Sequence, residues 1–116
     1  MAITVPYAGS GTIANTHAVS LVTPTSVASS IHAETGIYQL FIDFSNQTGL
    51  VEHEVKIYER VFNQPLRTVL TANVIGLQGD PVWTSPALAL TNWDMSLQRR
   101  SATSDTAIAW SIRRIA

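Results

Sequence analysis

The chain has 116 residues, enough for one domain, and 46% of them are hydrophobic, enough for a core. Seven basic and eight acidic residues give a formal charge of −1, so neither nucleic acid nor a membrane is expected as a partner. Cysteine is absent, which excludes disulfides, thiolate metal sites and a cysteine nucleophile. The chain does not begin with a basic segment followed by an apolar one, so we expect no secretory signal. No apolar run approaches the roughly 18 residues of a membrane-spanning helix.

The first 33 residues contain no charged side chain, although about a quarter of the residues of an average protein are charged. A surface segment normally carries charge for solvation, so we expect this one to lie against protein, either its own domain or a neighbouring copy. Residues 1–14 are accordingly predicted to form an N-terminal arm or a first edge strand. Residues 11–13 and 17–22 are weaker strand candidates, and 26–34 could form at most one helical turn.

A period-two alternation of apolar and polar residues predicts strands at 36–44 and 51–61. The polar, Gly-containing segment 45–49 between them predicts a hairpin. The side chains expected to face the core are Tyr38, Leu40, Ile42 and Phe44 in the first strand and Val51, Val55, Ile57 and Val61 in the second.

A turn at 63–65 leads into another alternating strand at 66–75. The segment 76–86 contains several Gly and Pro residues, which predicts a loop with one short strand at 82–84.

Two further strands are predicted towards the end of the chain. One begins at Trp93 and ends near Arg99, and the other is centred on Ile108, Trp110 and Ile112, with a polar turn at 101–105 between them. Together these elements predict one all-β domain spanning residues 1–116. It should be an antiparallel, jelly-roll-like β-sandwich of about seven or eight strands.

The candidate metal and phosphate ligands do not form a motif. His17, His32 and His53 have separations that match no zinc site. Gly9-Ser10-Gly11 lacks the lysine and the helix of a phosphate-binding loop, so we interpret it as a turn of small residues. Neither a metal ion nor a cofactor is therefore expected.

Catalytic residues are not predicted either. No Gly-x-Ser-x-Gly elbow is present to expose a nucleophilic serine. Glu52, Glu54 and Glu59 could supply a pair of carboxylates, but Lys56 and Arg60 alternate with them. A solvated strand face with salt bridges explains this pattern without catalysis, so we expect the chain not to be an enzyme.

The three tryptophans are assigned to different places. Trp93 and Trp110 are in phase with apolar neighbours, which predicts that both lie in the core. Trp83 lies in the least regular segment and is the aromatic most expected at a subunit contact. The predicted interface residues are Ile3, Val5, Tyr7, Ile13 and Trp83. Deletion of residues 2–14 is expected to leave a folded domain that no longer assembles.

From Glu52 onward the chain resembles small virion proteins of tailed bacteriophages and related prophage sequences. A charged strand, EVKIYERV at 54–61, is followed by a spaced pattern that ends in WSIR at 110–113. The matching residues between them are Arg67, Ala72, Gly76, Gln78, Pro81, Ser85, Pro86, Leu88, Leu90, Trp93, Leu97 and Gln98. The resemblance covers a little over half of the chain, and its motifs are short.

This resemblance implies a capsid decoration (cement) protein with no catalytic residues. Its partners would be the major capsid protein and copies of itself, as a dimer or trimer. It would be made in the cytoplasm of the host bacterium and bind the outer surface of the phage head.

Two alternatives remain open. One is a glycan-binding or host-attachment module of a phage tail or fibre, for which Trp83, Asp80 and Gln78 are the nearest candidates. The other is a tail-tube, tail-terminator or head–tail joining subunit.

Overall fold

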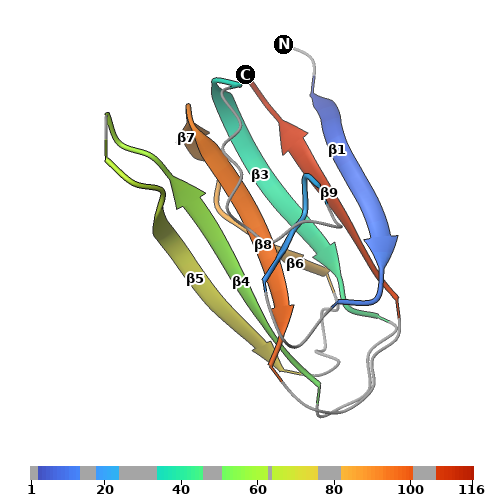
Figure 1. Ribbon diagram of the computed structural model, residues 1–116. Helices are drawn as coiled ribbons and strands as arrows, with labels where there is room; N and C mark the ends of the chain where they lie inside the picture. Colours follow the sequence, from blue (N-terminus) through green and yellow to red (C-terminus); the bar gives the residue numbers. More distant parts are fainter. Residues whose placement is uncertain are drawn as a thin grey trace.

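The computed structural model describes residues 3–13, 18–23, 34–45, 51–62, 64–75, 82–100 and 107–116. These ranges contain nine strands and no helix, so none of their segments could cross a membrane as a helix. The strands are β1 (Thr4–Gly11), β2 (Val19–Ser20), β3 (Gly36–Asp43), β4 (Glu52–Glu59), β5 (Arg67–Ile75), β6 (Val82–Thr84), β7 (Leu88–Leu90), β8 (Trp93–Arg99) and β9 (Ile108–Arg114). They form two antiparallel sheets packed face to face (Figure 1), which confirms the predicted sandwich.

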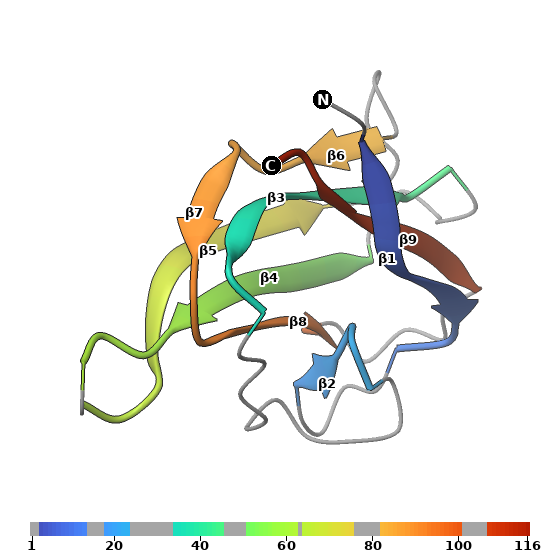
Figure 2. The same cartoon turned by 90° about the horizontal axis from the view of Figure 1, so that it is seen from above.

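The strand order is that of a jelly roll. One sheet has the order β1-β9-β3-β6, with β7 also paired to β3, and the other has the order β2-β8-β4-β5. The pairs are nested: β1 with β9, β2 with β8, β3 with β6 and β7, and β4 with β5. Such nesting describes one long hairpin rolled into two layers (Figure 2), as in double-sheet jelly rolls. Strand β2 lies within the strand candidate 17–22, and the additional β7, which the sequence did not predict, raises the strand number above the predicted seven or eight.

The core lies between the sheets and is formed by the alternating residues that the sequence predicted. Tyr38, Leu40, Ile42 and Phe44 of the β3 region are all buried. Across the sandwich they meet residues of β4 and β8, namely Val55, Ile57, Trp93, Met95 and Leu97. The expectation for Val61 is wrong: β4 ends at Glu59, and Val61 is 66% exposed because the chain is already turning there.

Strand β8 is buried on both faces, which its alternating sequence did not predict. Asp94 and Ser96 lie on the face opposite Met95, yet both are buried. Ser20 Oγ donates to Asp94 Oδ1 at 2.8 Å, and Ser96 Oγ is hydrogen-bonded to Tyr58 Oη at 2.9 Å. Because β8 lies between β2 and β4, neighbouring strands supply these polar partners.

The N-terminal segment is an edge strand of its own domain. Strand β1 pairs with β9 from Thr4 to Gly11, so Gly9-Ser10-Gly11 belongs to a strand and is not the predicted turn. Gly9 lies under the indole of Trp110, where an added Cβ would be 2.9 Å from Cζ2 of the ring. The packing of Trp110 therefore requires a residue without a side chain at this position.

Several predictions fall outside the described ranges. They are the histidines His17 and His32, the candidate sugar contacts Gln78 and Asp80, the turn at 101–105, and most of the segments 26–34 and 45–49. The hairpin predicted between 36–44 and 51–61 is wrong, because β3 and β4 belong to different sheets and the chain crosses from one layer to the other between them.

Candidate interaction surfaces

Three of the polar residues considered as catalysts or metal ligands make contacts within the domain. Glu54 forms a 3.6 Å ion pair with Lys56, as the solvated-face interpretation predicted. Glu59 accepts hydrogen bonds from the backbone N–H and hydroxyl of Thr91. His53 is buried, with its ring centroid 5.4 Å from that of Phe44. Within the described ranges, no three side chains of His, Asp or Glu gather where they could hold a metal ion.

The five predicted interface residues occupy different environments. Ile3, which directly precedes β1, and Val5, within the edge strand β1, are 66% and 53% exposed, so a partner could reach them. Tyr7 is half-buried, and Ile13 belongs to the hydrophobic core. Trp83, on β6, is half-buried against the edge of the core. Only Ile3 and Val5 thus present most of their apolar surface to solvent.

Tyr7 holds β1 onto the domain. Its ring packs edge-on against Trp93, with centroids 5.9 Å apart, and its hydroxyl donates a hydrogen bond to the Glu34 carboxylate. Burial, and then this carboxylate, raise the pKa of Tyr7 to about 12. The indole of Trp93 and the hydroxyl of Tyr38 both donate to the Glu34 carbonyl, at 3.0 and 2.7 Å. These contacts tie β1 to Glu34, which directly precedes the start of β3.

Deletion of residues 2–14 therefore removes more than a binding arm. It would take away the edge strand β1, the Tyr7 contacts with Trp93 and Glu34, and the core residue Ile13. We now expect this deletion to destabilise the domain, because a core position and a ladder of backbone hydrogen bonds are lost together. Point substitutions at Ile3 and Val5 test a contact role without this effect.

The opposite side of the sandwich carries a second group of exposed aliphatic residues. Val69 and Ile75 on the edge strand β5 are 52% and 53% exposed, and Val82 on β6 is 48% exposed. In Figure 1, β5 lies at the left margin of the molecule and β1 at the right. The two lateral edges of the sandwich, one at β1 and the other at β5 and β6, thus both expose apolar side chains.

A hollow of about 320 Å³ opens between β5 and β6. Its lining consists of Asn73, Val74, Ile75 and Trp83. Trp83, one of the predicted interface residues, therefore lines a surface cavity. Asn73 is the polar residue of this lining, but its side chain alternates with that of buried Val74 and therefore lies on the outer face of β5.

The turn between β4 and β5 is the third apolar feature. Phe62 is 83% exposed and has a φ of 53°, which is uncommon for a residue other than glycine. The turn is closed by a 3.0 Å hydrogen bond from the Gln64 N–H to the Val61 carbonyl, and Arg60 N–H is bonded to the Asn92 carbonyl at 2.8 Å. Figure 2 shows this hairpin extending away from the rest of the sandwich. An aromatic ring is therefore held in solvent on a defined turn.

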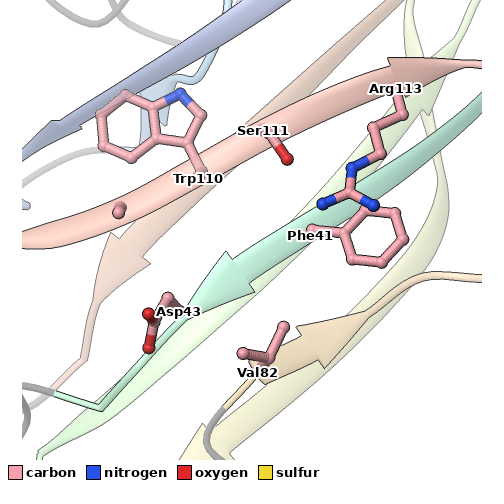
Figure 3. A pocket seen from close by; sticks show the side chains of 7 residues that line it. Phe41, Asp43, Val82, Trp110, Ser111 and Arg113 are labelled. Carbon is pink, nitrogen blue, oxygen red and sulfur yellow. The ribbon is translucent and has the colours of Figure 1, made fainter. Parts of the chain in front are cut away.

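The outer face of the β1-containing sheet has a shallow hollow of about 290 Å³ (Figure 3). The Arg113 guanidinium lies 3.7 Å above the Phe41 ring and covers it. Asp43 lines the same hollow, and hydrogen bonds from Ser45 hold its pKa below the usual value. Because the cation already occupies the aromatic face, this hollow offers little free apolar surface to a ligand.

Sequence reasoning missed Phe62, Val69 and Ile75 as surface features. Val61 continues the apolar phase of β4, which concealed the start of the turn. The Asn-Gln-Pro sequence directly after Phe62 was the available signal that this aromatic belongs to a turn. For β5 no local signal existed, because its sequence does not reveal that it would lie at an edge.

Comparison with known proteins finds no match among family models, curated proteins or solved structures. The resemblance to phage decoration proteins therefore stays a prediction from the sequence.

Proposed function

We propose that this chain is a non-enzymatic virion structural protein. In this proposal it is a capsid decoration (cement) protein that binds the outer surface of a phage head, where its partners are the major capsid protein and its own copies. The observation that carries the proposal is the exposure of apolar side chains on both lateral edges and on the projecting turn of a sandwich.

This arrangement suits a repeating assembly. Ile3 and Val5 lie on one lateral edge, whereas Val69 and Ile75 lie on the other. A subunit with separate contacts on opposite sides can bind one neighbour through each, which closed rings and shells require. Phe62, which is exposed on the turn between β4 and β5, offers a third contact.

The fold is compatible with this role. Jelly rolls are found in viral capsid proteins and in lectins, so the architecture allows both the decoration role and its glycan-binding alternative. This is an analogy between folds, and the choice between the two roles depends on the surfaces.

The energetics favour many weak contacts. Burying an aliphatic side chain contributes about 1.5–3 kcal/mol, so Ile3 and Val5 together contribute only a few kcal/mol before the cost of association. A single contact of this kind is weak. Repetition over a capsid surface raises the apparent affinity by orders of magnitude, because each bound copy holds its neighbours at high effective concentration.

The test uses particles of the phage that encodes the chain. Gold-labelled antibodies against the purified protein should decorate the heads of intact particles in electron micrographs. Heads that lack the protein should rebind the wild type and an Ala8→Ser control in a sedimentation assay. The double variant Ile3→Ser, Val5→Ser should bind at least tenfold more weakly, with an unchanged melting temperature. Absence of the protein from particles, or label on tails alone, would refute the decoration role.

A glycan-binding module is the second candidate, and the hollow beside Trp83 favours it. An indole at a surface hollow can stack on a sugar ring, and polar groups of the lining can bond its hydroxyls. A glycan array should then give a signal with the wild type that is lost in Trp83→Ala and retained in Asn73→Ala, whose side chain lies on the outer face of β5. No signal with the wild type ends this candidate.

A further inference from the structure

Strand β5 lies at the edge of its sheet. It pairs with β4, and within the described ranges no other strand pairs with it. The free N–H and C=O groups of an edge strand can bind an additional strand, so proteins commonly protect long edges with charged residues, proline or bulges. Residues 68–75 contain no charged residue, proline or glycine. The one irregularity is at Val69, which has no partner on β4, so residues 70–74 form a regular edge without these protective features.

The other long edge is better protected. Strand β1 contains Pro6, which lacks a backbone N–H, and its pairing with β9 is irregular between Thr4 and Tyr7. Gly9 and Gly11 also reduce the side-chain surface along this strand. Of these two long edge strands, β5 is therefore the better template for another strand.

We propose that a second copy of this chain docks on β5 by antiparallel pairing of the two β5 strands about a twofold axis at Ala72. Leu70 of each copy then faces Val74 of the other, and Thr71 faces Asn73. Aliphatic residues face aliphatic residues, polar residues face polar residues, and the small Ala72 faces itself. Since no charged side chain lies in this ladder, the pairing brings no like charges together.

The side chains of β5 also remain incompletely covered in the single chain. Leu70 and Ala72 face the interior of the sandwich but are only half-buried, unlike Val55 and Ile57 of the neighbouring β4. A paired strand from a second copy would cover the open side of both residues. The exposed Val69 and Ile75 flank the same ladder and would be partly covered as well.

The size of the contact indicates a weak dimer. Five paired residues span about 17 Å, and at a sheet thickness of about 10 Å the strands bury on the order of 400 Å² in total. Stable complexes bury at least about 1,200 Å², so we expect pairing at high protein concentration. On a capsid surface, the same contact would join adjacent copies and be reinforced by avidity. This last step rests on the proposed function, whereas the pairing itself does not.

Cysteine cross-linking tests the contact directly, because the chain has no cysteine and a single introduced one can only link two copies. Facing Cβ atoms lie about 4.5–5.5 Å apart, close to the separation that a disulfide needs. Under mild oxidation at high concentration, Ala72→Cys should form a covalent dimer at least tenfold faster than Ala109→Cys, whose exposed residue lies on a central strand. Equal rates for the two variants would overturn the proposal.

A charge variant provides an independent measurement. Thr71→Lys, Asn73→Lys places two exposed charges beside the axis and should abolish the concentration-dependent increase of mass in light scattering. The control Ala109→Lys should retain this increase, and unfolding curves verify that both variants fold. A wild type that stays monomeric at millimolar concentration would also overturn the pairing. If the wild type dimerises but does not bind phage particles, this result contradicts only the proposed function, and the pairing stands.

Discussion

The placement of β1 in the sheet can be tested with two glycines of the same strand. At Gly9, a new Cβ would meet the Trp110 ring at 2.9 and 3.2 Å, whereas at Gly11 it would meet no atom within 4 Å. The ring has little room to move, because Trp110 is 5% exposed and its Nε1 donates to the Leu21 carbonyl at 3.0 Å. Overpacking of this kind costs about 1–3 kcal/mol.

A second effect acts on both glycines. Replacing glycine by alanine restricts the unfolded chain and stabilises the folded protein by about 0.4–1 kcal/mol. We therefore expect Gly9→Ala to lower the free energy of unfolding by about 1–2 kcal/mol and Gly11→Ala to leave it unchanged or slightly raised. In a domain of this size, 1 kcal/mol corresponds to about 4 °C in melting temperature.

Urea titration followed by tryptophan fluorescence measures both variants. Equal stability of Gly9→Ala and Gly11→Ala would refute the close packing of β1 on β9. The N-terminal segment would then be an arm that contacts another molecule.

The remaining predictions concern polar contacts. In the folded protein the pKa of Tyr7 is about 12, above its unfolded value of 10.0, so stability is full below pH 10 and falls as the pH rises towards 12. Tyr7→Phe should therefore remove one group that titrates near pH 12 from the tyrosinate absorbance curve, and an unchanged curve would contradict the assignment. Ser20→Ala removes a buried 2.8 Å hydrogen bond to Asp94 and should cost about 1–3 kcal/mol in urea unfolding. The exposed control Ser10→Ala should change stability by less than about 0.5 kcal/mol, and similar losses in both variants would exclude a special role for Ser20.

The sequence by itself determined the fold class and most of the core. Alternation is a local property, because successive side chains of a strand point to opposite faces, so Tyr38, Leu40 and Ile42 could be assigned to one buried face without knowledge of their partners. The assignments of Trp93 and Trp110 to the core follow from the same phase and are confirmed.

The tertiary structure decided which strands became edges and which residues reached the surface. Pairing of β1 with β9 joins the two ends of the chain, and no local pattern encodes such a contact. It placed Ile13 in the core and left Ile3 exposed, although both belong to the same uncharged segment. In the same way, β5 became an edge strand because, among the described strands, it pairs only with β4. Pairing depends on the partners available across the whole sheet rather than on the strand's own residues.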